Sequence, residues 1–83
     1  MNQLINNSMK QRVLDIINEI RAAKSLAPIK ELHDEDNLRD TLGLTSFDLA
    51  ELTVKLEDEF DIDIFEDGLV NTVGEIYSKL ESK

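Results

Sequence analysis

The sequence predicts an all-α fold, a small bundle of three main helices plus one short helix. Apolar residues recur at helical spacing in three separate stretches, around residues 9–20, 49–60 and 73–80. Each stretch is preceded or opened by a Ser or Thr with an acid or amide three residues further on, the pattern of a capping box. No stretch shows the strict alternation of apolar and polar residues that predicts a strand. The 83 residues leave room for one small domain.

The first helix is expected to begin after Ser8, the N-cap of a capping box that Gln11 completes. It should end near Ala23, well before Pro28, because proline cannot continue a helix. Residues 1–7 are expected to be a flexible extension and residues 8–83 the folded domain. The apolar residues that should face the core are Met9, Val13, Ile16, Ile17 and Ile20.

Residues 24–41 form a long connection that contains the only proline of the chain. A short helical turn is expected near its end, from Leu38 to Leu42. The residues that should fasten the connection to the core are Ile29, Leu32, Leu38 and Leu42.

The second helix should begin after Gly43, with Thr45 as its N-cap and Asp48 three residues later, and should end around Asp61. Ser46 then occupies the first helical position and points outward. One apolar stripe should face the core: Leu49, Leu52, Leu56 and Phe60. A second apolar stripe is rotated away from it: Phe47, Ala50 and Val54. A charged face is expected on a third side of this helix, formed by Asp48, Glu51, Lys55 and Asp58.

A short turn or helix is expected over residues 66–70. Thr72 and Glu75 then form a capping box that opens the last helix. Gly74 in the first turn should weaken this helix by about 1 kcal/mol relative to alanine. The residues on its core side are Val73, Ile76, Tyr77 and Leu80.

The chain is strongly acidic, with a net charge of −9 that is unevenly distributed. Residues 1–30 hold five Lys or Arg and two Asp or Glu, whereas residues 31–83 hold four and sixteen. An acidic surface repels nucleic acid and anionic lipid and attracts basic patches on protein partners. No apolar run approaches membrane-spanning length, so a cytoplasmic protein is expected. The chain has no cysteine, which excludes disulfides and thiolate metal sites.

Ser46 is the candidate functional residue. A helix N-terminus has unpaired backbone N–H groups and the positive end of the helix dipole, so it stabilises a nearby phosphate. The commoner role of a serine near a helix start is capping alone, and this alternative stays open. Phe47 and Val54 are candidates for a docking surface, although packing against the long connection would also explain them.

Other chemistries have weaker support. His33 is the only histidine, and an exposed position in the long connection is expected for it. The acids around Asp61 and Asp63 resemble a calcium loop, but Phe65 stands at the third ligand position and Glu66 at the glycine position. Loose binding of a divalent ion by these acids stays open.

The run from Gly43 to Leu52, followed by residues 56–64, resembles the acyl carrier protein family. Members of this family carry a Gly-x-Asp-Ser-Leu signature, a Glu-Leu pair five residues after the serine, and a Leu-Glu-x-Glu-Phe segment at the end of the same helix. Glu51-Leu52 and the segment Leu56-Glu57-Asp58-Glu59-Phe60 match the last two of these features. The likeness spans residues 8–80, so it covers nearly the whole domain.

The resemblance implies that Ser46 accepts 4′-phosphopantetheine from coenzyme A through a separate phosphopantetheinyl transferase. The thiol of this arm then holds an acyl or related intermediate as a thioester and presents it to enzymes of fatty acid, polyketide or related biosynthesis. The chain would be a freestanding, monomeric carrier and not an enzyme. Acyl-processing enzymes with basic patches would dock on positions that match the family: Phe47, Asp48, Glu51, Val54 and Asp58.

Three positions depart from the family pattern. Thr45 stands where the family has aspartate, Phe47 replaces the common leucine, and Lys55 interrupts the acidic face. These departures indicate a specialised carrier whose cargo, whether fatty acyl, polyketide, aminoacyl or D-alanyl, stays open. The alternative is an unmodified acidic helical interaction module, in which Thr45 marks a lost modification site. A small hydrolase built on Ser46 and His33 has the least support.

Overall fold

The computed structural model describes residues 7–66 and 68–81. Its three α-helices are α1 (Asn7–Ala23), α2 (Ser46–Phe60) and α3 (Val73–Glu81). The all-α prediction is therefore confirmed for these residues, whose only strand-like pairing is an isolated bridge between Asn37 and Thr72. The described helices include none that is long and apolar enough to cross a membrane.

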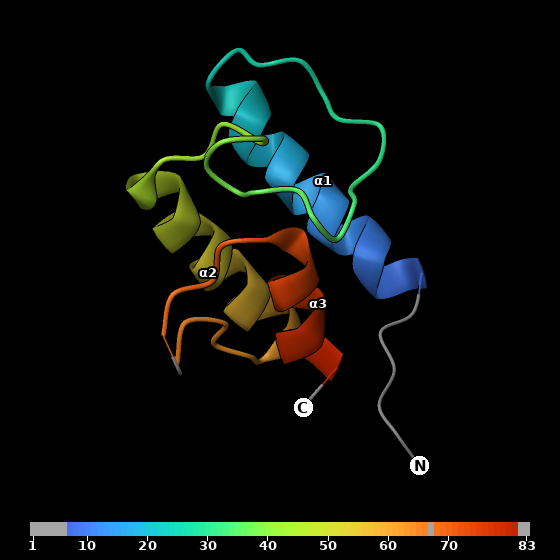
Figure 1. Cartoon of the computed structure of the whole chain (residues 1–83), viewed down its shortest axis with the longest axis vertical. Coiled ribbons are helices and arrows are strands. Elements are labelled where there is room, and N and C mark those ends of the chain that lie inside the picture. The colour runs from blue at the N-terminus through green and yellow to red at the C-terminus, as the bar shows by residue number, and fades with distance from the viewer. Residues whose placement is uncertain (1–6, 67, 82–83) are drawn as a thin grey trace.

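Helices α1 and α2 pack against each other in antiparallel orientation (Figure 1). Arg12, near the start of α1, binds Glu59 near the end of α2 at 2.8 Å. Lys24, just after α1, binds Asp48 in the first turn of α2 at 2.6 Å. The two ion pairs therefore fasten both ends of the helix pair.

Apolar side chains from all three helices and both connections form one core. The core stripes predicted for the three helices are confirmed, with Met9 and Phe60 partly buried at the edge. The long connection is fastened to the core as expected: Leu38 and Leu42 are buried in it, and Ile29 and Leu32 pack against it while partly buried. The buried apolar residues are Val13, Ile16, Ile17, Ile20, Leu38, Leu42, Leu44, Leu49, Leu52, Leu56, Ile64, Val70, Val73, Ile76, Tyr77 and Leu80.

The predicted start of the first helix was wrong. Helix α1 begins at Asn7, so Ser8 lies inside it and is not its N-cap. The amide of Gln11 donates a hydrogen bond forward to Asp15 at 2.8 Å instead of reaching back to Ser8. The extension expected over residues 1–7 otherwise lies outside the described residues.

The short fourth helix does not appear in the described residues. Residues 64–66 form a turn, and residues 66 and 68–70 carry no helix. The segment from Leu38 to Leu42 is a hydrogen-bonded turn, closed by the Thr41 N–H on the Asn37 carbonyl at 3.0 Å. Helix formation needs a costly nucleus, and neither segment is long enough to repay it.

The long connection runs alongside the start of α3. The N–H groups of Val73 and Gly74 donate to the carbonyls of Asp36 and Asp34, at 3.0 and 2.9 Å. The capping box predicted for α3 is confirmed: the Thr72 hydroxyl accepts from the Glu75 N–H, and the Glu75 carboxylate accepts from the Thr72 N–H. The Asn71 N–H also donates to the Glu75 carboxylate, and this hydrogen bond, followed by that from the Thr72 N–H, holds the pKa of Glu75 below its usual value.

Candidate functional site

Ser46 is the first residue of α2, and its side chain is exposed, both as predicted. The Ser46 hydroxyl forms no hydrogen bond with any other described residue. It therefore does not cap its own helix, because that role belongs to its neighbour Thr45. The hydroxyl stays available to a reagent that approaches from solvent.

A capping box fixes the start of α2. Thr45 has an extended backbone, and its hydroxyl accepts a hydrogen bond from the Asp48 N–H at 3.2 Å. The Asp48 carboxylate accepts in return from the Thr45 N–H at 2.9 Å. The predicted N-cap is thus confirmed, and the helix starts at a defined residue rather than fraying.

Asp48 does not belong to the exposed charged face, and this part of the prediction was wrong. The residue is 7% exposed because its carboxylate folds back over the helix start. The hydrogen bond from Lys24, followed by that from the Thr45 N–H, holds the pKa of Asp48 below its usual value. Its charge is therefore used inside the fold, whereas Glu51 is half-buried and Asp58 is exposed.

Two basic residues, Arg21 and Lys24, hold the segment that precedes Ser46; we call them the basic clasp. Lys24 Nζ donates to the Gly43 carbonyl at 2.8 Å as well as to Asp48. Arg21 donates through Nη1 to the Leu42 carbonyl and through Nη2 to that of Ala27 at 2.8 Å. The clasp thus ties the start of α2 to the end of α1.

The sequence analysis did not identify the basic clasp. The sequence does place two cations, three residues apart, at the expected end of α1, and basic side chains at a helix C-terminus often bind its free carbonyls. Apart from the nearby Ala27 carbonyl, which Arg21 also binds, their backbone acceptors lie 21 and 19 residues away in sequence, at Leu42 and Gly43. Gly43, whose carbonyl is the acceptor of Lys24, has a φ of +74°, a conformation that glycine adopts without strain.

The second apolar stripe of α2 is exposed as predicted. Phe47 and Val54 are 79% and 63% exposed, and Ala50 between them is also exposed. The long connection does not cover them. Lys55 on the neighbouring face lies 3.8 Å from Glu19 of α1, so its charge is partly offset within the chain.

A hollow of about 320 Å³ lies beside Ser46; we call it the Ser46 hollow. Its walls come from the first turns of α2, the α2–α3 connection and Arg39. Apolar side chains make up most of the wall, and polar groups of Ser46, Arg39 and Asn71 interrupt it. The residues that line it are Arg39, Ser46, Leu49, Ala50, Phe65, Leu69, Val70 and Asn71.

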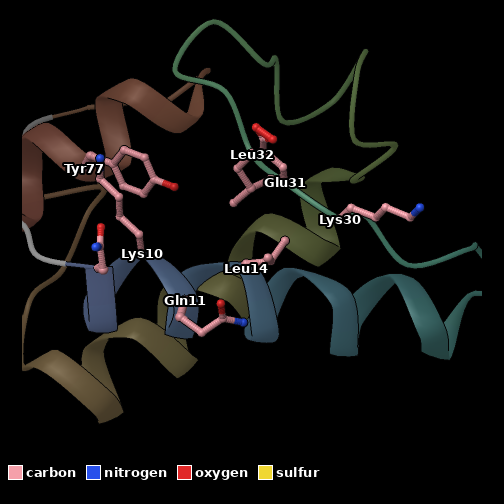
Figure 2. Close-up of a pocket in the computed structure, with 8 residues that line it drawn as sticks. Lys10, Gln11, Leu14, Lys30, Glu31, Leu32 and Tyr77 are labelled. Atoms are coloured by element: carbon pink, nitrogen blue, oxygen red, sulfur yellow. The ribbon is translucent and has the colours of Figure 1, made fainter.

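A second hollow, of about 290 Å³, lies between α1, the long connection and α3 and contains none of the predicted site residues. Figure 2 shows Leu14 of α1 rising toward Leu32 of the connection, with Lys10 extended toward the ring of Tyr77. Lys10 Nζ lies 5.1 Å from the centre of that ring, within cation–π range. Lys30 points away from Tyr77 in the same view.

The structure does not join His33 to Ser46. His33 is exposed, as predicted, and its ring nitrogens lie 3.5 Å from Glu31 and 3.6 Å from Asp36, both in the long connection. Within residues 7–66 and 68–81, no group of three or more acids and histidines is arranged to hold a metal ion. No histidine or acid among the described residues forms a hydrogen bond with the Ser46 hydroxyl.

This geometry suits a residue that another protein modifies. An exposed hydroxyl at a capped helix start can carry a phosphoester, and the apolar hollow beside it can cover a neighbouring alkyl group. Acyl transfer by the chain itself would require a base to activate the serine, and no described side chain supplies one at Ser46.

Comparison with known proteins identifies the family. Residues 11–80 match the family model of the phosphopantetheine attachment site. An acyl carrier protein of Amoebophilus asiaticus is 38% identical over 79 residues, which cover 93% of this chain and 94% of the relative. An acyl carrier protein of an Exiguobacterium species is 32% identical over 76 residues (89% and 96%), and acyl carrier protein 3 of Ralstonia nicotianae is 33% identical over 72 residues (84% and 83%). The chain therefore belongs to the acyl carrier protein family, whose members are carriers with a covalently attached 4′-phosphopantetheine arm and not enzymes.

Proposed function

We propose that Ser46 is the residue that carries the 4′-phosphopantetheine arm. The observation that supports this is the placement of its hydroxyl, which is exposed and without a hydrogen bond in the described residues, at the first position of a capped helix. The helix start stabilises the phosphodiester that attachment creates. The basic clasp and the capping box keep this position fixed while a transferase acts on it.

The surroundings of Ser46 fit the arm. The arm supplies a terminal thiol that holds cargo as a thioester. Leu49, Phe65 and Val70 line the Ser46 hollow with apolar surface, against which the uncharged part of the arm or a short alkyl cargo can rest. The chain positions the arm and shields it with apolar side chains, and the partner enzymes carry out the reactions on the cargo.

Partner enzymes, including the transferase, are proposed to dock on the exposed face of α2. Phe47 and Val54 supply apolar contacts, and Glu51 and Asp58 supply charges for a basic patch on the partner. Asp48, which matches a docking position of the family, has its carboxylate turned inward and is proposed to act only by fixing the helix. The intermediates carried are proposed to belong to fatty acid, polyketide or related biosynthesis, with the chain acting as a monomer in the cytoplasm.

Thr45 does not favour the alternative of an unmodified interaction module. A threonine at the N-cap keeps the capping box that the family's aspartate would form, and α2 begins at Ser46 as modification requires. The replacement therefore alters the side chain that a transferase meets without moving the serine.

The test is incubation of the chain with coenzyme A and a broad-specificity phosphopantetheinyl transferase, followed by intact-mass measurement. We expect the added mass of one arm on the wild type and on the control Ser78→Ala, which removes an exposed hydroxyl from α3. Ser46→Ala should add nothing. Modification that survives Ser46→Ala would refute the assignment of Ser46, whereas no modification of a folded wild type would refute the proposal and favour the interaction module.

A further inference from the structure

Arg39 is a cation without a described partner beside the proposed attachment residue. It lines the Ser46 hollow, and its guanidinium forms no ion pair or hydrogen bond with any residue in the ranges 7–66 and 68–81. The basic clasp is already engaged, since Lys24 binds Asp48 and a carbonyl while Arg21 binds carbonyls alone. Arg39 is thus the basic side chain of this hollow that is left to meet an incoming anion.

Attachment of the arm places a phosphodiester on a chain whose net charge is already −9. The helix start supplies part of the stabilisation of this phosphodiester, but the Asp48 carboxylate already takes up the Thr45 N–H and the Lys24 charge. A guanidinium is planar and forms paired hydrogen bonds with two oxygens of a phosphate, which an ammonium does less well. The chemistry of Arg39 therefore matches the charge that modification of Ser46 creates.

We propose that Arg39 binds the phosphodiester of the arm attached to Ser46 and so directs the arm along the Ser46 hollow. This inference rests on the proposed function of Ser46. An arm held in this way lies beside the apolar wall formed by Leu49, Phe65 and Val70. Arg39 acts here as a positioning residue and takes no part in bond making.

The test compares unmodified and modified forms, the latter with a free thiol and no cargo, of the wild type, Arg39→Gln, Arg39→Lys and the control Lys30→Gln. Lys30 is exposed, lines the hollow of Figure 2 and not the Ser46 hollow, and its substitution removes the same charge. We expect Arg39→Gln to lower the Tm of the modified form by roughly 2–5 °C more than that of the unmodified form. Lys30→Gln should change both forms equally, and Arg39→Lys should retain part of the difference.

Two further readouts distinguish binding from a general effect of charge. The difference for Arg39→Gln should shrink at high ionic strength. The ³¹P resonance of the phosphodiester should shift in Arg39→Gln and stay unchanged in Lys30→Gln.

Intact mass separates this inference from the one on which it rests. If Ser46 takes no arm, the proposed function fails. If Ser46 carries the arm but Arg39→Gln shows equal Tm changes in both forms and an unchanged ³¹P resonance, the role of Arg39 is overturned while the carrier function stands.

Discussion

Substitution of Asp48 tests how much its buried carboxylate contributes to the start of α2. We expect Asp48→Asn to lower the free energy of unfolding by about 1–2 kcal/mol, because Lys24 and the Thr45 N–H lose the charge of a buried carboxylate to which both donate. Urea unfolding at neutral pH measures the change. The control is Asp58→Asn, which removes an exposed carboxylate of the same helix and should have an effect near zero.

The same carboxylate should produce a pH dependence of stability. Lys24 and the Thr45 N–H lower the pKa of Asp48, so its charge stabilises the fold above the unfolded-state pKa of about 3.9. This contribution is lost as the pH falls through the lowered pKa. The stability difference between the wild type and Asp48→Asn should therefore be constant from about pH 7 to 5 and shrink below about pH 4. A difference that grows on acidification would contradict the assigned contacts.

The sequence predicted single residues well where the cause was local. Thr45 as N-cap and the outward placement of Ser46 follow from capping chemistry within a few positions, and both were found. Asp48 was predicted correctly as the capping partner of Thr45, but its placement on the outer charged face was wrong, because first-turn side chains can fold back over the helix start. Arg21 and Lys24 were missed because their acceptors are set by tertiary packing.

Gly74 lies in helix α3 although glycine has a low helix propensity. Its cost within α3 was expected, but a Cβ at this position would lie 3.1 Å from the Asp34 carbonyl oxygen, which accepts the Gly74 N–H. We expect Gly74→Ala to lower the free energy of unfolding by about 1 kcal/mol instead of raising it, because overpacking outweighs the gain in helix propensity. Thermal unfolding measures the sign. Ser78→Ala, at an exposed position of the same helix, should be neutral or slightly stabilising.

The two apolar stripes of α2 should separate stability from docking. Leu56 is fully buried, so Leu56→Ala should cost about 2–5 kcal/mol. Phe47 is 79% exposed, so Phe47→Ala should change the free energy of unfolding by less than about 0.5 kcal/mol. The same variant should lower kcat/KM for transfer of the arm by roughly 5–30-fold if the ring is a docking contact. Unchanged kcat/KM with Phe47→Ala and Val54→Ala would assign the stripe no part in docking.

Three helices could be predicted because periodicity and capping signals agreed, and α2 was the clearest case. The start of α1 at Asn7 could not, because the Ser8 pattern imitated a capping box without forming one. The course of the long connection past α3 also escaped prediction. It depends on backbone hydrogen bonds between residues 34–38 and 71–74, which leave no pattern in side-chain chemistry.

Most cations among the described residues contact acids, carbonyls or an aromatic ring of the same chain. Arg12 and Lys24 of the N-terminal part pair with Glu59 and Asp48 of α2, and Lys55 of α2 lies near Glu19 of α1. Residues 31–83 hold most of the acids, and this excess gives the outer face of α2 its negative field. Such a field raises the rate of encounter with a basic partner more than the final affinity.

Reversal of the Glu51 charge should slow encounter with a basic partner. Glu51→Lys should lower kcat/KM for arm transfer by a transferase with a basic docking patch roughly 3–10-fold at low ionic strength, because encounter with the patch becomes slower. The defect should shrink as salt is added, since a Debye length of about 8 Å at physiological ionic strength shortens to about 3 Å at 1 M. Glu35→Lys makes the same charge change at an exposed position of the long connection, away from the stripes of α2, and should have a smaller effect. Equal effects of the two variants would mean that only net charge matters, whereas a larger, salt-sensitive effect at Glu51 locates docking on α2.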